Sequence, residues 1–125
     1  MSRAGFLLIL ASAGSTVMAN LAFRKAVLQA APSSSAARSL AALLASLLPQ
    51  PLFIAGLVAY AVAAALWLRA LATEQVTTGY PLLVSMTFVL VTVGAVLLLR
   101  ESVSWQKGLG LCFILAGIAL IARAP

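Results

Sequence analysis

The sequence predicts an all-α integral membrane protein, a bundle of four transmembrane helices and one short interfacial helix that is expected to be dimeric. Hydrophobic residues make up 64% of the chain and charged residues 8%, whereas about a quarter of a soluble domain is charged. Roughly 20 helical residues cross the hydrocarbon core of a bilayer. Four uncharged apolar stretches approach that length, at 5–23, 52–68, 77–99 and 108–122. With their flanks they predict spans at about 5–28, 52–71, 77–100 and 104–123, in a single transmembrane domain over 1–125.

The first apolar stretch also has features of a signal peptide, because Arg3 precedes an apolar run and small residues follow it. Apolar character continues through Phe23, however, and three further spans follow. We therefore interpret the stretch as the first transmembrane helix.

One face of this first helix is polar. Ser12, Thr16, Asn20 and Arg24 are spaced by four, and residues at i and i+4 share a helix face. In lipid, such a stripe faces protein or water. The hydroxyls of Ser12 and Thr16 can equally satisfy backbone carbonyls, but the amide of Asn20 needs a partner from protein, water or a ligand.

The segment between the first two spans contains an amphipathic pattern. Leucines at 40, 43, 44, 47 and 48 predict a helix over about 39–48, which follows a loop at 31–37. It is too short to span, so we expect it to lie at the membrane surface. A re-entrant segment packed within the protein is the alternative.

Charge and composition exclude several functions. The eight basic residues, which give a net charge of +6, lie between spans or at their ends, a position typical of topology signals and lipid contacts rather than nucleic-acid binding. The chain has no histidine and one cysteine, Cys112, so we expect no metal site, no cofactor and no enzymatic activity. Both acidic residues, Glu74 and Glu101, fall at span ends.

Residues of the C-terminal half resemble the drug/metabolite transporter superfamily. The segment 79–83 reads GYPLL, an apolar span follows, and 99–110 reads LRESVSWQKGLG. The last span resembles the dimer-forming helix of the small multidrug resistance family, in which two glycines seven apart line the contact. That resemblance implies that Gly110 and Gly117 form a dimer contact, since they share a face after about two turns.

Two four-helix branches of the superfamily differ at the first helix. Small multidrug exporters carry a glutamate there, whereas 11–17 reads ASAGSTV. The flippase subunits for aminoarabinose-phosphoundecaprenol are more similar, in LWLRAL at 66–71, YPLL at 80–83 and FVLV at 88–91. The resemblance implies a flippase subunit that moves a polyprenyl-phosphate-linked sugar across the bacterial inner membrane. A small multidrug or small-cation exporter is the alternative.

A flippase of this kind implies specific roles and partners. We expect headgroup phosphate to be bound by Arg24, Lys25, Arg69 and Arg100, and the sugar pathway to be lined by Ser12, Thr16, Asn20, Tyr80, Ser85 and Glu101. The basic residues can alternatively extend to membrane lipids. For Glu101 we favour an ion pair with Lys107 or Arg100 over contact with an amino group on the sugar. The expected partners are the lipid-linked sugar, membrane lipids and a second subunit, in a homodimer or in a heterodimer with a related four-helix chain, with no nucleic acid.

Overall fold

The computed structural model describes residues 1–30 and 39–124, and within that part of the chain it contains α-helices and no strands. The helices are α1 (Arg3–Ala30), α2 (Leu40–Leu47), α3 (Pro51–Leu71), α4 (Val76–Leu98) and α5 (Trp105–Arg123). All but α2 are long and apolar enough to cross a membrane. The predicted all-α membrane fold class is confirmed. The predicted loop at 31–37 lies outside the described residues.

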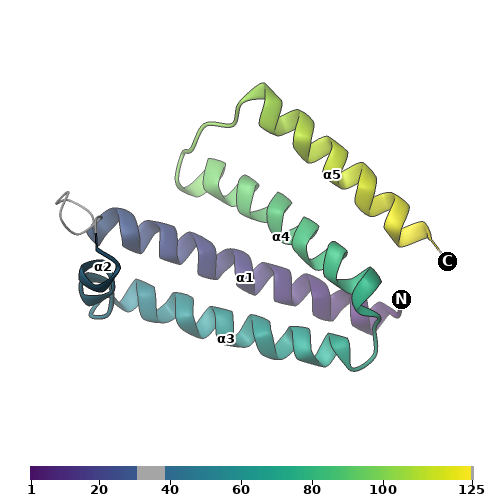
Figure 1. Cartoon of the computed structure of the whole chain (residues 1–125), viewed down its shortest axis with the longest axis horizontal. Coiled ribbons are helices and arrows are strands. Elements are labelled where there is room, and N and C mark those ends of the chain that lie inside the picture. Colours follow the sequence, from purple (N-terminus) through teal and green to yellow (C-terminus); the bar gives the residue numbers. More distant parts are fainter. Residues whose placement is uncertain (31–38, 125) are drawn as a thin grey trace.

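The long helices run alternately up and down (Figure 1). α1 lies between α3 and α4, and α5 lies against the outer side of α4. Both chain termini are at one end of the bundle, while α2 and the α4–α5 connection are at the other. We call the latter the Arg24 end, because Arg24 lies in the last turns of α1.

The closest packing is between α1 and α3, and small residues make it possible. Ala13 and Ala19 of α1 are fully buried, as is Ala70 of α3, and Ala63 is nearly so. At Gly56 the ring of Phe23 occupies the space in which a side chain would begin. Small residues let backbones approach closely in a membrane protein, so α1 and α3 form the most closely packed pair of the bundle.

The short helix α2 is capped by Ser39, whose hydroxyl accepts a hydrogen bond from the Ala42 amide at 3.4 Å. Its bounds lie within the predicted 39–48, and it contacts α1 at the Arg24 end. Pro51 then begins α3 at a position where a missing N–H is tolerated. That α2 lies on the membrane surface stays a prediction.

The connection between α4 and α5 is fixed by backbone geometry. α4 ends at Leu98, before the predicted end, because Arg100 adopts a left-handed conformation with φ 54°. The Glu101 amide then donates to the Ala95 carbonyl at 3.2 Å, which closes the helix as glycine usually does. Ser104 caps α5 by accepting a hydrogen bond from the Lys107 amide. The turn therefore presents Glu101 toward α1.

Candidate functional site

The polar stripe of α1 is satisfied by backbone carbonyls along its length. The Ser12 hydroxyl, 1% exposed, donates to the Ala63 carbonyl of α3 at 2.8 Å. Within α1, Thr16 donates to the Ser12 carbonyl at 2.9 Å and the Asn20 amide nitrogen to the Thr16 carbonyl at 3.0 Å. The hydroxyls of Ser12 and Thr16 therefore both donate to backbone carbonyls, which is the alternative that the sequence left open. Their oxygens keep acceptor capacity.

Asn20 also has a partner across the helix interface. The Tyr60 hydroxyl of α3 donates to the Asn20 side-chain oxygen at 2.9 Å, and the Tyr60 ring stacks on Phe23 with centroids 5.3 Å apart. Sequence reasoning missed Tyr60. Its signal was present, because a tyrosine within an alanine-rich span needs a partner for its hydroxyl.

Ser15 was missed as well. Its hydroxyl donates to the Ala59 carbonyl at 2.7 Å, one helical turn from the bond that Ser12 makes to α3. Together the two serines tie α1 to α3 at successive turns. The polar face of α1 is therefore wider than the i, i+4 series predicted.

Glu101 pairs with Arg24, with 3.1 Å between Oε1 and Nε. The expectation that it pairs with Lys107 or Arg100 is wrong. Lys107 and Arg100 are close to Glu101 in the sequence. The left-handed turn at Arg100 and the packing of α4 beside α1 instead bring the Glu101 carboxylate to Arg24, 77 positions earlier. The ion pair thus joins the end of α1 to the α4–α5 connection.

Three adjacent hollows follow the polar stripe and share lining residues. The first, about 180 Å³, has Ser12, Thr16 and Tyr60 in its wall. The second, about 330 Å³, shares Thr16 and Leu83 with it and adds Tyr80 and Thr87.

The third hollow, also about 330 Å³, shares Val91 with the second and is bounded by Asn20, Arg24 and Glu101. We call the three together the α1–α4 groove. It begins beside Ser12 and ends at the Arg24–Glu101 pair. Most of its wall is apolar; among the described residues that line it, hydroxyls and one amide occur along its length, and charged groups occur only at the end.

The remaining predicted residues are distributed over the molecule. Lys25 and Arg100 are exposed at the Arg24 end, whereas Arg69 is exposed at the opposite end, near the end of α3. Ser85 is half-buried on α4 and is not among the residues that line the groove. The structure therefore places Arg24 in one hollow with Asn20 and Glu101, and it places the predicted residues Ser12, Thr16 and Tyr80 in the adjoining hollows of the same groove. It separates Arg69 from the other predicted phosphate ligands.

The outer helix α5 has an open face. No residue of α5 is buried. Among the described residues, no heavy atom outside the local helix lies within 4 Å of the point where a side chain would begin at Gly110 or Gly117. The predicted dimer contact thus falls on a surface that residues 1–30 and 39–124 leave uncovered.

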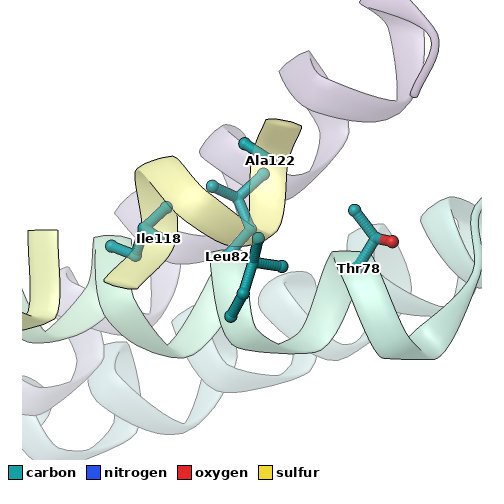
Figure 2. Close-up of a pocket in the computed structure, with 5 residues that line it drawn as sticks. Thr78, Leu82, Ile118 and Ala122 are labelled. Atoms are coloured by element: carbon teal, nitrogen blue, oxygen red, sulfur yellow. The ribbon is translucent and has the colours of Figure 1, made fainter. Parts of the chain in front are cut away.

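Between α4 and α5 the hollows are apolar. One of about 260 Å³ is bounded by Met86, Val89 and Leu115 among others. A second, of only about 10 Å³, lies between Leu82, Ile118 and Ala122, with Thr78 at its edge (Figure 2). A cavity of this size holds at most about one water molecule, so it is a packing gap.

At the opposite end, Glu74 holds the start of the chain. Its Oε1 accepts from the Ser2 amide at 3.0 Å and from the Ser2 hydroxyl at 2.6 Å. These hydrogen bonds, the hydroxyl first, lower the pKa of Glu74 from its ordinary value of 4.5. A side chain at Gly5 would overlap the Glu74 carboxylate. Both acidic residues therefore have structural partners at the bundle ends.

The side chains that line the groove are suited to binding a polar group. Within the described residues no group of three or more His, Cys, Asp or Glu side chains is placed to hold a metal ion. The α1–α4 groove offers hydrogen-bonding side chains in its middle and a guanidinium at its end. Such a groove can hold an anionic polar group while the rest of a molecule stays in lipid.

Fold and groove together define the class, a four-span integral membrane protein whose first helix borders a groove with a few hydrogen-bonding side chains among apolar ones. Comparison with known proteins agrees with the sequence resemblance. The chain is 35% identical over 81 residues to the probable 4-amino-4-deoxy-L-arabinose-phosphoundecaprenol flippase subunit ArnF of Proteus mirabilis, covering 63% of this chain and 60% of that protein. It is 45% identical over 69 residues to the corresponding ArnF of Shewanella sediminis, covering 54% and 47%.

The related subunit ArnE is similar too. The probable ArnE of Erwinia tasmaniensis is 44% identical over 55 residues, covering 44% of this chain and 50% of that protein. The predicted resemblance to aminoarabinose-phosphoundecaprenol flippase subunits is thus confirmed, and these relatives are named as transport subunits. The match spans about half to 60% of the length of the curated relatives.

No family model matches the chain, and no solved structure matches it. The expected location, multi-pass in the bacterial inner membrane, is confirmed by the four apolar helices together with the similarity to flippase subunits.

Proposed function

We propose that this chain is a subunit of a flippase that moves a polyprenyl-phosphate-linked aminosugar across the bacterial inner membrane. The polar head passes along the α1–α4 groove while the polyprenyl tail stays in lipid. The observation that carries the proposal is the groove itself, in which the hydroxyls and amide of α1 lead to Arg24. The similarity to flippase subunits supports it independently.

The groove supplies what a sugar head needs inside a membrane. A polar group in hydrocarbon must have hydrogen-bond partners, and Thr16 and Asn20, which are half-buried in the groove wall, offer them at successive helical turns. Ser12 is 1% exposed and already bonded to the Ala63 carbonyl, so its direct contact with the head stays a prediction. Tyr80 and Thr87 face the same hollow from α4. Ser85 is retained as a secondary candidate, because it lies on the same helix.

Cations at the two ends suit the phosphate. Arginine binds phosphate oxygens through parallel hydrogen bonds, whereas lysine acts as a point charge. Arg24 is the primary phosphate ligand, with Lys25 and Arg100 nearby at the same end. Arg69 lies at the opposite end of the bundle, so a head that crosses the membrane meets a cation on either side. Contact with ordinary membrane lipids is the other role of these side chains.

The working unit is a dimer in this proposal. The uncovered face of α5, with Gly110 and Gly117, allows a second helix to approach closely. The partner that packs on this face of α5 is a second copy of this chain or a related four-helix subunit.

Transport needs no cofactor and no chemical step in this proposal. The groove has no acidic group in its middle that could exchange a proton. The lipid therefore moves down its own concentration gradient, and its consumption on the far side pulls the flux. The chain is accordingly a transporter and not an enzyme.

The direct test is the lipid that copurifies with the protein from its native membrane. Mass spectrometry should find an undecaprenyl phosphate ester of an aminopentose, and Asn20→Leu should reduce its amount. Ala61→Leu, a matched change at an exposed position of α3, should leave it unchanged. Copurification of a quaternary ammonium compound in place of a polyprenyl-phosphate-linked sugar would favour the exporter alternative and reject the flippase.

A further inference from the structure

We propose that the substrate exchanges the Arg24–Glu101 ion pair, and that Glu101 thereby selects heads that carry a cationic amine as well as a phosphate. This inference rests on the proposed function and assigns specificity within it. The pair forms the wall of the third hollow of the α1–α4 groove. At about 330 Å³ that hollow is in the size range of small-molecule sites.

The Arg24–Glu101 ion pair is weak enough for a ligand to replace one partner. The side chains are 52% and 43% exposed, and within the described residues their contact is one bond from Nε to Oε1. Exposed ion pairs with a single contact add little free energy. A phosphate engages a guanidinium through two parallel hydrogen bonds. A phosphate in this hollow therefore replaces Glu101 on Arg24.

Replacement leaves Glu101 without its partner. The Glu101 side chain is 43% exposed, so the loss of its partner costs only the small free energy of an exposed ion pair, and a bare phosphate lipid binds against that cost. A head with an ammonium group supplies a new cation to Glu101 while its phosphate takes Arg24. One ion pair becomes two, whereas a neutral sugar leaves Glu101 unpaired.

The position of Glu101 is fixed well enough for this role. The left-handed turn at Arg100 and the bond from the Glu101 amide to the Ala95 carbonyl hold its backbone. Within the described residues it is the single carboxylate at the Arg24 end, because Glu74 lies at the opposite end with Ser2. Selection of an amine at this end therefore depends on Glu101.

The test measures binding of three probes to the purified full chain in nanodiscs. The probes are a short polyprenyl phosphate, its ester with a neutral pentose and its ester with an aminopentose. Wild type should prefer the aminopentose ester over the neutral ester by about twofold to fivefold, the range that one exposed ion pair supplies. Glu101→Gln should bind the bare phosphate tighter by a similar factor and should lose the preference for the amine.

Two controls make the result specific. Glu74→Gln removes the other acidic side chain of the sequence and should change neither affinity nor preference. Arg24→Gln should weaken binding of all three probes, and Arg24→Lys should restore part of it. Tighter binding by Glu101→Gln cannot come from misfolding, so the central outcome does not depend on a loss of function.

Two results would overturn the proposal. One is unchanged or weaker binding of the bare phosphate by Glu101→Gln. The other is a wild type without amine preference, as expected if Arg100 or Lys107 neutralised the released carboxylate. The experiment measures binding and not transport, so a failure of this proposal can be distinguished from a failure of the proposed flippase function. Amine-selective binding with no flipping would reject the flippase and keep the selection site.

Discussion

Tyr60 donates a hydrogen bond to Asn20 across the α1–α3 interface, with 2.9 Å between the hydroxyl oxygen and Oδ1. Asn20 is the single asparagine of the chain, and it also donates to the Thr16 carbonyl. The bond holds the amide at the wall of the α1–α4 groove. It therefore links the packing of α1 against α3 to the proposed pathway.

Removal of this hydroxyl should weaken the fold slightly. Tyr60→Phe is expected to cost about 0.6 kcal/mol, the average value of interhelical hydrogen bonds measured in a membrane protein. Unfolding in mixed micelles with increasing SDS measures the change. Tyr80→Phe is the matched control, because the Tyr80 hydroxyl makes no hydrogen bond within the described residues. Equal losses in both variants would show that the Asn20 bond contributes nothing specific.

Close packing of α1 against α3 predicts a sharp size limit at Ala63, which is 4% exposed. Ala63→Leu should destabilise the protein by about 1–3 kcal/mol, because the added atoms must be accommodated in a packed interface. Ala61→Leu, at an exposed position two residues away, should be nearly neutral. The same SDS unfolding experiment checks both. Tolerance of leucine at Ala63 would contradict the close α1–α3 contact.

Arg100 allows backbone and side-chain roles to be separated. A non-glycine residue in the left-handed conformation costs about 1–2 kcal/mol, so Arg100→Gly should stabilise the protein by roughly 1 kcal/mol by relieving that cost at φ 54°. If the guanidinium binds phosphate as proposed, the same variant should flip lipid more slowly. A variant that is less stable than wild type would show that the side chain holds the fold instead.

The Glu74 clamp predicts a pH dependence at the start of α1. The pKa of Glu74 is lowered by the Ser2 hydrogen bonds, so its stabilising effect is complete above the ordinary value of 4.5 and is lost as the pH falls through the lower folded-state pKa. Hydrogen exchange of the Gly5 amide, which donates to the Ser2 hydroxyl, reports on the clamp.

Comparison with Glu74→Gln at each pH removes the intrinsic pH dependence of exchange. Wild type should protect Gly5 better than the variant at neutral pH, and the two should converge in acid. A difference that persists below the folded-state pKa would contradict the clamp.

The four long helices could be predicted because their signal is local. Each is an uninterrupted apolar stretch, and the bounds of α3 and α5 fall within about a residue of the prediction. The end of α4 differed because a non-glycine residue takes the left-handed position at Arg100, which composition does not reveal. The i, i+4 spacing likewise predicted that Ser12, Thr16, Asn20 and Arg24 share a face, and they line one groove.

What could not be predicted depends on which helices are neighbours. Local charge spacing favoured Lys107 or Arg100 as the partner of Glu101, but the packing of α4 beside α1 selected Arg24. Tyr60 was missed for the same reason, since its role requires α3 to lie against the Asn20 face. Contacts between distant segments follow from helix packing, which one sequence without packing information leaves open.

We propose that the α1–α4 groove conducts a lipid head that carries a phosphate, and that it does so without proton exchange. The measurement is the flipping rate of a polyprenyl-phosphate-linked aminopentose in proteoliposomes of the purified protein, with its partner subunit if one copurifies, with and without an imposed proton gradient. We predict equal initial rates under both conditions, and rates lowered about tenfold or more by Asn20→Leu, since about 1.4 kcal/mol of lost stabilisation gives that factor. Flipping that occurs only with a proton gradient would contradict conduction without proton exchange.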